Sequence, residues 1–218
     1  MDDDYIGITE THAMSYHIQS WFFAASGKLF LNAHFQNFWN AYKPLSYRLH
    51  CINNGEIGMP RYLSRYGIHP NPLYTQNMIL DLIFEGTLAE AVETLLNYIG
   101  PQEFKGLFET VERITFTQFP DERTAHGFLK RGVMERLGKS NTMNAANLIL
   151  LNRTAFPFVK KDLVYRGRYL FTQIDRALGE WVGEDAEQLK EILSYFRSRG
   201  TLWWQYSPSA IFARMGLL

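Results

Sequence analysis

The chain has 218 residues, of which 46% are hydrophobic and 20% are charged, and this balance excludes a disordered or low-complexity protein. Lysine plus arginine and aspartate plus glutamate each number 22, so the formal net charge of +0 disfavours non-specific binding of nucleic acid or anionic lipid. The single cysteine, Cys51, excludes an internal disulfide framework and a multi-cysteine zinc or iron–sulfur site. Tyrosine and tryptophan contribute to an aromatic content of 15%, and such side chains can line a sugar-binding surface as readily as a core.

The sequence predicts neither a membrane span nor a secretory signal. No hydrophobic stretch approaches the roughly 20 residues that span a bilayer. The start, Met1–Asp4, is acidic where a secretory signal would be basic. We therefore expect a cytoplasmic protein, and at this length we expect one domain with a sizeable hydrophobic core.

The beginning of the chain predicts two short strands and an amphipathic helix. Tyr5–Ile8 and the aromatic-rich segment Ile18–Ala25 are β-prone, and the polar segment Thr9–Tyr16 between them predicts a loop. Aromatic side chains then recur at helical spacing until Pro44, which cannot continue a helix. These side chains are Phe35, Phe38, Trp39 and Tyr42.

A second helix is predicted to begin at Glu56. Asn53-Asn54-Gly55 is a turn signal, and the pattern from Glu56 to Tyr66 is helical and ends at Gly67. The next segment, Ile68–Tyr74, contains two prolines and predicts an extended conformation that suits a sheet edge.

The rest of the chain predicts successive helices, with a surface loop at Thr115–Arg123. The helical segments are Gln76–Phe84, Leu88–Ile99, Thr124–Leu137, Met143–Leu151, Arg168–Val182 and Asp185–Arg199. The sequence thus predicts an α/β (α+β) chain. Residues 1–74 supply the strands and the Glu56 helix, and residues 75–218 are a mainly helical continuation of the same domain.

Generic catalytic motifs leave the reaction undefined. The six histidines form no HExxH pattern, and the nearest pair, His12 and His17, has no cysteine beside it. No glycine-rich phosphate loop, GxSxG turn or dinucleotide-binding fingerprint is present. The sequence therefore predicts no metal site.

Two polar segments are candidate sites, and each also has a structural explanation. Alternation along the predicted strand Ile18–Ala25 places Gln19 opposite Ile18, facing a cleft, although buried polar side chains here would equally satisfy backbone groups. Glu56 lies between Gly55 and Gly58, which allow a ligand to approach the backbone, although glutamate is also common in the first turn of a helix.

Four segments of the first 74 residues keep the order and spacing of a known family. They are Tyr5–Thr11, Ser15–Phe22, Phe35–Trp39 and Gly55–Gly58, with a weaker similarity at Asn144–Lys161. This pattern resembles the rhamnan synthesis protein F family, glycosyltransferase-like proteins of bacterial cell-surface polysaccharide assembly.

The resemblance implies a partial glycosyltransferase type A-like fold. This chain would correspond to the acceptor half and would lack the N-terminal nucleotide-binding half. The implied activity is sugar transfer from a nucleotide-sugar donor to a glycan acceptor in rhamnan or O-antigen (lipopolysaccharide) biosynthesis, at the cytoplasmic face of the membrane. Mg²⁺ or Mn²⁺ would accompany the donor, but Asp2 and Asp4 have no preceding strand to hold them as a metal-binding pair.

The resemblance also assigns candidate residues. Glu56 would be the base for the acceptor hydroxyl, because a glutamate is ionised at neutral pH and the neighbouring glycines leave room for a sugar ring. The candidate substrate-binding residues are Glu10, Thr11, His17, Gln19 and, for the donor phosphate, Lys160.

Two alternatives stay open. Because the resemblance implies that the donor half is missing, the chain could be a non-catalytic interaction module of a polysaccharide assembly complex that docks on a partner chain or on a second copy. The helical second half also fits a binding protein unrelated to sugar transfer. Convergence of Glu10, His17, Gln19 and Glu56 on one cleft would favour the transferase, whereas their scatter would favour the last alternative.

Overall fold

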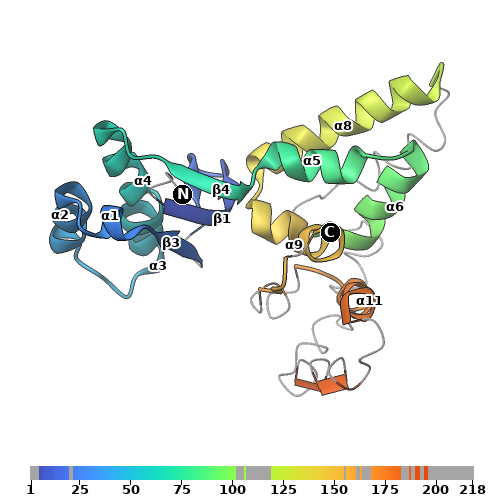
Figure 1. Cartoon of the computed structure of the whole chain (residues 1–218). Helices are drawn as coiled ribbons and strands as arrows, with labels where there is room; N and C mark the ends of the chain where they lie inside the picture. Colours follow the sequence, from blue (N-terminus) through green and yellow to red (C-terminus); the bar gives the residue numbers. More distant parts are fainter. Residues whose placement is uncertain are drawn as a thin grey trace. The chain divides into compact units, whose positions relative to one another are not determined.

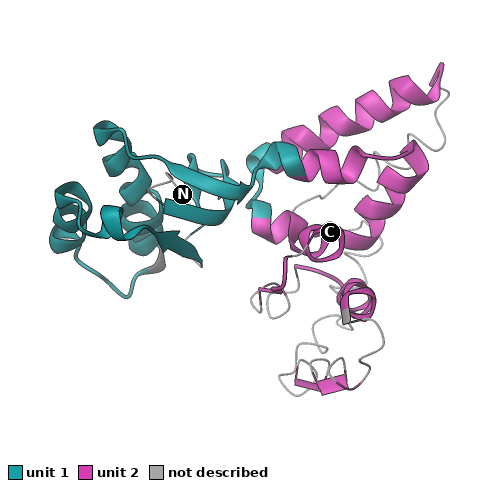
Figure 2. Cartoon of the chain, viewed as in Figure 1, with its two compact units in different colours: residues 1–78, 138–142 teal, residues 79–137, 143–218 magenta. Residues whose placement is uncertain are grey.

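The computed structural model describes most of the chain, and it divides the chain into two compact units (Figure 2). The described residues are 5–19, 22–101, 106, 119–154, 156–160, 163, 168–182, 187, 190–191 and 194–195. Unit 1 comprises residues 1–78 and 138–142, and unit 2 comprises residues 79–137 and 143–218. Each unit has its own arrangement of helices and strands.

Unit 1 is built on a small mixed sheet centred on β1 (Tyr5–Thr11). The C-terminal end of β1 pairs antiparallel with β2 (His17–Ile18), and its N-terminal end pairs antiparallel with β3 (Phe23–Ala25). β4 (Pro70–Tyr74) runs parallel to β1, as Figure 1 shows. The α+β fold class is therefore confirmed.

The predicted single strand Ile18–Ala25 is wrong. Between the Glu10–Ile18 and Gly7–Phe23 pairs, β1 advances by three residues while its partner advances by five. The two extra residues interrupt the ladder, so Gln19 and Phe22 lie outside both strands. β1 in turn is longer than predicted and continues through Thr11, so that Thr9–Thr11 belong to a strand and the loop begins at His12.

Short helical segments connect β3 to β4 (Figure 1), and they form the core of unit 1 together with residues of β1 and β2. They are α1 (Gly27–Phe30), α2 (Ala33–Ala41), α3 (Arg48–His50), the π-helix η1 (Cys51–Glu56), α4 (Gly58–Leu63) and the 3₁₀ turn η2 (Ser64–Tyr66). The Asn32 side chain accepts hydrogen bonds from the backbone N–H groups of His34 and Phe35, which fixes the start of α2. The buried cluster comprises Tyr5, Ile18, Leu29, Phe35, Met59, Leu63 and Ile68.

The predicted turn at Asn53-Asn54-Gly55 is also wrong, because these residues lie inside the π-helix η1. The backbone N–H of Ile57 donates to the carbonyl of Ile52 over 2.9 Å, the five-residue spacing that defines this helix type. Glu56 therefore ends η1 and does not begin the next helix. The predicted extended segment Ile68–Tyr74 is confirmed over its last five residues as β4.

Unit 2 is helical in its described residues. Its helices are α5 (Gln76–Phe84), α6 (Leu88–Tyr98), α8 (Glu122–Lys139), α9 (Thr142–Arg153) and α11 (Phe171–Val182). The first turn of α5, the last two residues of α8 and the first residue of α9 belong to unit 1. These elements confirm five predicted helices, although α11 begins three residues later than predicted and α8 already covers the end of the predicted loop. The predicted helix Asp185–Arg199 and the start of the loop at Thr115 lie mostly outside the described residues.

The core of unit 2 follows the helical period. Leu129, Val133 and Leu137 recur every four residues on α8, and all three are fully buried. α9 is buried along almost its whole length. Within the residues that the structure describes, no helix combines the length and hydrophobicity needed to cross a bilayer.

Candidate functional site

The structure brings His17 and Glu56 together in unit 1. His17 belongs to β2 and is 4% exposed, and its Nε2 lies 4.0 Å from Oε2 of Glu56 at the end of η1. The other ring nitrogen, Nδ1, lies 2.8 Å from the backbone carbonyl oxygen of Ser15. Because a carbonyl can only accept a hydrogen bond, Nδ1 carries a proton and donates it to Ser15, and this contact leaves Nε2 facing Glu56.

A pocket of about 180 Å³ opens at Glu56. It is lined by Ile18, Phe23, Trp39, Tyr42, Cys51, Gly55, Glu56 and Met59, which come from β2, β3, α4, η1 and the end of α2. The π-helix supplies Cys51, Gly55 and Glu56, because a turn with five-residue hydrogen bonds brings its first residue and the fourth and fifth that follow to one face. A carboxylate thus lies on an otherwise mainly hydrophobic wall.

Two aromatic side chains give this pocket flat and polar surfaces. The rings of Trp39 and Tyr42 meet edge to face at 5.6 Å. Gly55 lets the Tyr42 ring approach the backbone, since a Cβ atom at that position would lie 3.3 Å from the phenol oxygen. Partial burial raises the pKa of Tyr42, and the Cys51 thiol and the Glu56 charge raise this pKa further. The phenol therefore stays a neutral hydroxyl group at physiological pH.

Glu10 does not line this pocket. Its Oε1 accepts a hydrogen bond from the backbone N–H of Gln76 over 2.9 Å, at the start of α5. The carboxylate thus satisfies one of the free N–H groups of that helix and lies at the positive end of its dipole.

Thr11 and Gln19 are also used inside the fold. The Thr11 hydroxyl donates to the carbonyl of Ser140 over 3.2 Å, and Thr11 is 1% exposed. The Gln19 side-chain oxygen accepts a hydrogen bond from the Thr9 hydroxyl over 2.8 Å, and Gln19 is 4% exposed. These contacts match the structural explanation of the segment, since buried polar groups need partners.

Lys160 belongs to unit 2, where its backbone N–H donates to Oδ1 of Asn147 over 3.3 Å. Its assignment to the donor phosphate stays a prediction. The four residues predicted to converge on one cleft were Glu10, His17, Gln19 and Glu56. The structure brings His17 and Glu56 together, whereas Glu10 and Gln19 bind other parts of the fold.

Of the eight lining residues, sequence reasoning singled out only Glu56 and its neighbour Gly55, and it missed Trp39, Tyr42 and Cys51 among others. The two aromatic residues fitted an amphipathic helix, and helical spacing alone does not separate a core face from the wall of a pocket. The aromatic content was the relevant signal, but it carries no positional information.

No metal-dependent step is assigned to this site. Among the residues that the structure describes, no three histidine, cysteine, aspartate or glutamate side chains come together as metal ligands. Asp2 and Asp4 lie outside the described residues. The lining of the Glu56 pocket includes one carboxylate, that of Glu56 itself.

Comparisons of the chain with protein-family models, with curated proteins and with solved structures find no match. The functional argument therefore depends on the residues of the site.

Proposed function

We propose that the chain is the acceptor-binding half of a glycosyltransferase of rhamnan or O-antigen-type cell-surface polysaccharide biosynthesis, with Glu56 as the base. The observation that carries this proposal is the pair formed by His17 and Glu56, 4.0 Å apart, beside an aromatic pocket. The rhamnan synthesis resemblance of the first 74 residues supports the choice of reaction class.

The pair suits two adjacent hydroxyl groups of one sugar ring. The neutral His17 tautomer with its proton on Nδ1 would offer the Nε2 lone pair as an acceptor, and Glu56 would offer a second acceptor at Oε2. One hydroxyl donates to His17 and is held in place, and its neighbour donates to Glu56. His17 is then a residue that orients the acceptor, and Glu56 is the group that receives the reacting proton.

The size of the pocket favours an acceptor over a donor. Its volume of about 180 Å³ lies below the roughly 300–1,000 Å³ of sites for drug-sized ligands. One sugar ring fits this space, but a nucleotide diphosphate sugar does not. Trp39 offers a hydrophobic surface for the C–H face of the ring, and the neutral Tyr42 hydroxyl offers a further hydrogen bond.

The reaction follows from these contacts. As the acceptor oxygen forms its bond to the anomeric carbon of the donor sugar, its proton moves to Oε2 of Glu56. The bond from the anomeric carbon to the nucleotide diphosphate breaks, and the diphosphate leaves with the electron pair. A separate nucleotide-binding half would hold the donor, as the resemblance implies.

A transfer assay tests the proposal. Purified chain is combined with a nucleotide-binding half of a rhamnan synthesis transferase, dTDP-rhamnose and a rhamnose-containing oligosaccharide, with and without Mg²⁺ or Mn²⁺. We expect Glu56→Gln to lower turnover by about 10²- to 10⁴-fold with little change in the KM for the acceptor, because general base catalysis is lost. We expect His17→Ala mainly to raise that KM. Glu10→Gln is the matched control, because this carboxylate caps α5 outside the pocket. Full turnover in Glu56→Gln would contradict the assignment of the base.

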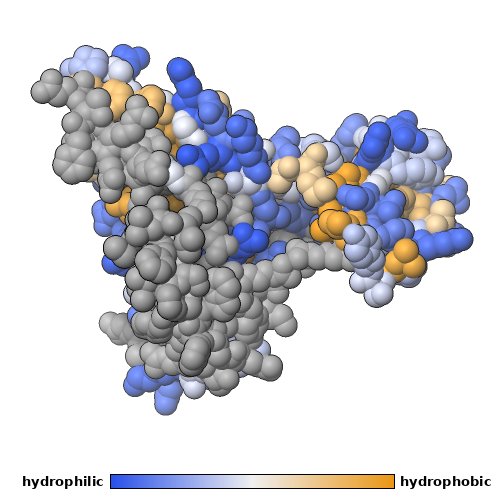
Figure 3. Space-filling view, turned by 180° about the vertical axis from the view of Figure 1, so that it is seen from behind, coloured by the Kyte–Doolittle hydropathy of each residue, from blue (hydrophilic) through white to orange (hydrophobic). Residues whose placement is uncertain are grey.

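The surface of unit 1 supports a second candidate function, the non-catalytic interaction module. Phe30, Leu31 and Tyr47 are 64%, 76% and 63% exposed. Figure 3 shows hydrophobic residues at the surface of this unit, in orange. Exposed hydrophobic surface is typical of a face that contacts another chain. A folded chain that does not bind the rhamnose-containing oligosaccharide in calorimetry and forms oligomers in light scattering would favour this function. A monomer with transferase activity would exclude it.

A further inference from the structure

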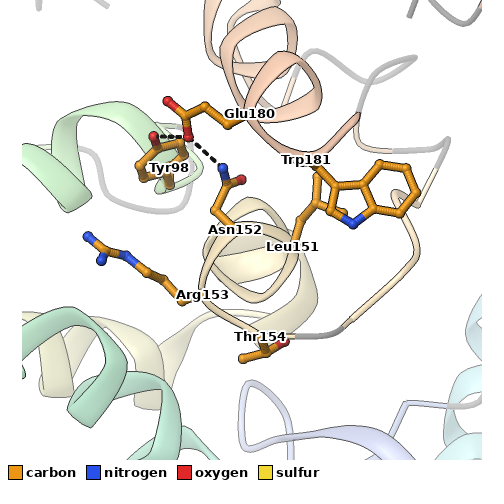
Figure 4. Close-up of a pocket in the computed structure, with 7 residues that line it drawn as sticks. All are labelled: Tyr98, Leu151, Asn152, Arg153, Thr154, Glu180 and Trp181. Carbon is orange, nitrogen blue, oxygen red and sulfur yellow. Dashed lines mark hydrogen bonds between the residues drawn. The ribbon is translucent and has the colours of Figure 1, made fainter. Parts of the chain in front are cut away.

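The polar side chains of a second pocket, in unit 2, bind one another (Figure 4). This pocket has a volume of about 430 Å³ and lies beside α6, the end of α9 and α11. Oε2 of Glu180 on α11 accepts hydrogen bonds from the Tyr98 hydroxyl over 2.5 Å and from Nδ2 of Asn152 over 2.6 Å. These contacts join three helices of unit 2, so they have a structural explanation that needs no ligand.

A row of aromatic side chains in unit 1 extends the Glu56 pocket. It begins at Tyr42, which lines the pocket, and the ring of Phe38 stacks on that of Tyr42 with centroids 6.1 Å apart. The row then passes from α2 to α4, because the ring of Tyr62 lies 5.7 Å from that of Phe38 and 5.3 Å from that of Tyr66. It ends at His34, whose ring stacks on Tyr66 at 3.5 Å and 13°. We term these five residues the aromatic row.

Helical spacing explains why the aromatic row is straight and long. His34, Phe38 and Tyr42 recur every four residues along α2 and its C-terminal end, so their side chains share one face. Tyr62 and Tyr66 are also four residues apart, and α4 packs against α2. Tyr42 follows His34 by eight residues, which corresponds to about 12 Å along a helix axis. The row therefore extends well beyond the space that one sugar ring fills in the pocket.

The aromatic row is only partly buried. Phe38 and Tyr62 pack against the core cluster of unit 1 but remain half-buried. Tyr66 is 46% exposed, and His34, which stacks on it, is half-buried. Tyrosine rings that are open to solvent combine hydrophobic area with a polar hydroxyl group, a combination that is typical of binding surfaces. The outer edge of the row therefore offers flat hydrophobic surface to a ligand.

The segment that carries the aromatic row has an excess of positive charge. Residues 27–66 contain one carboxylate, that of Glu56, and five lysine and arginine residues: Lys28, Lys43, Arg48, Arg61 and Arg65. A hydrogen bond with Tyr66 and partial burial raise the pKa of Tyr62, whereas the nearby charge of Arg65 lowers it. Arg61 and Arg65 are exposed, and neither forms an ion pair with the residues that the structure describes. Their guanidinium groups are suited to a phosphate or a carboxylate.

We propose that the aromatic row binds the acceptor chain beyond its reacting sugar, and that this part of the chain carries negative charge. The inference rests on the proposed function, because Tyr42 belongs both to the row and to the pocket for the reacting sugar. Successive sugars lie with their C–H faces against the row, and an anionic group at its far end meets Arg65. A nucleic acid suits the row less well, because the Glu56 carboxylate at its start would repel a phosphodiester backbone.

The first test measures how the affinity of the full chain depends on glycan length. The probes are methyl α-L-rhamnoside and the methyl glycosides of rhamnose di-, tri- and tetrasaccharides, in calorimetry and saturation-transfer NMR without a donor. We expect affinity to rise with length. Tyr66→Ala should weaken binding of the tetrasaccharide by about tenfold, the scale of an aromatic contact, and leave the monosaccharide unchanged, whereas Tyr66→Phe should retain most of the affinity. Tyr47→Ala is the matched control, because Tyr47 is an exposed tyrosine of unit 1 outside the row.

The second test measures the effect of charge. The probe is the rhamnose tetrasaccharide with a phosphate on its reducing-end sugar, compared with the neutral methyl glycoside. We expect the phosphate to tighten binding by about two- to fivefold at low salt, and we expect high salt and Arg65→Gln each to remove this gain. Arg131→Gln is the matched control, because Arg131 is an exposed arginine on α8 of unit 2.

The proposal is overturned by any of four results. They are no binding of any glycoside, equal affinity for all lengths, equal affinity for the neutral and phosphorylated tetrasaccharides, and tighter binding of single-stranded oligothymidylate than of either tetrasaccharide. Turnover in Glu56→Gln separates this proposal from that of the base. Full turnover in Glu56→Gln together with length-dependent binding would refute the base alone, whereas lost turnover with equal affinity for all lengths would refute the aromatic row alone.

Discussion

Gly7 of β1 allows Ile18 to pack against the strand, and this contact predicts a large effect of Gly7→Ala. A Cβ atom at Gly7 would lie 2.7 Å from Cβ and 2.8 Å from Cδ1 of Ile18, well inside normal contact distance. Ile18 cannot move away freely, because it is 2% exposed and belongs to the core cluster of unit 1. We therefore expect Gly7→Ala to lower the free energy of unfolding by about 1–3 kcal/mol, as other overpacked cores do.

Gly27→Ala is the matched control for this substitution. A Cβ atom at Gly27 would meet no atom within 4 Å, and the residue begins helix α1. We expect its stability to be unchanged or higher by up to about 1 kcal/mol, because alanine restricts the unfolded chain more than glycine does. Urea unfolding followed by circular dichroism measures both variants. Equal stability of Gly7→Ala and Gly27→Ala would refute the steric argument. Ile18 also lines the Glu56 pocket, so Gly7→Ala should weaken acceptor binding as well.

Two further predictions concern a helix cap and a phenol. Glu10→Gln keeps an oxygen that can accept from the Gln76 N–H but removes the charge at the start of α5, so we expect a loss of about 0.3–1 kcal/mol in urea unfolding. If neither Glu10→Gln nor Glu10→Ala lowers the free energy of unfolding, this cap does not stabilise the helix. For Tyr98, the folded pKa of about 12 lies above the ordinary value of 10.0, so the fold favours the neutral phenol. The resulting stabilisation is complete below about pH 10 and is lost as the pH rises through 12. The tyrosinate absorbance that disappears in Tyr98→Phe should therefore titrate near pH 12, and titration near pH 10 would contradict the burial of this phenol and its bond to Glu180.

The helices could be predicted because their determinants are local. The range Gln76–Phe84 is predicted exactly as α5, and the predicted helix from Leu88 differs from α6 by one residue at its end. Thr87 and Glu90 form a reciprocal capping box at the start of α6, a signal that lies entirely within four residues of sequence. Hydrophobic period and capping then agree on the same boundaries.

The interruption between β2 and β3 could not be predicted in the same way. Ile18–Ala25 has the composition of one continuous strand, and its local preferences do not specify where pairing stops. The break follows from the register with β1. Between the Glu10–Ile18 pair and the Gly7–Phe23 pair, the segment that joins β2 to β3 has two more residues than the facing part of β1. Register depends on the packing of Ile18 over Gly7, a contact between residues that are eleven positions apart.

The meeting of His17 and Glu56 depends on the same two departures from local rules. The interrupted ladder ends β2 directly after Ile18, so His17 lies in the short pair with Thr11 at the end of β1. The π-helix then determines which way Glu56 faces. In an α-helix the residue that faces Cys51 one turn later would be Asn54 or Gly55, whereas the wider turn of η1 places Glu56 on that face as well. Sequence reasoning could therefore select Glu56 by its glycine neighbours. It could not predict that Glu56 lies beside His17, because the sequence Asn53-Asn54-Gly55 is typical of a turn and gives no sign of a π-helix. π-Helical turns are uncommon and occur frequently at functional sites, so the unusual backbone at Cys51–Glu56 is itself evidence that supports the Glu56 pocket as the site.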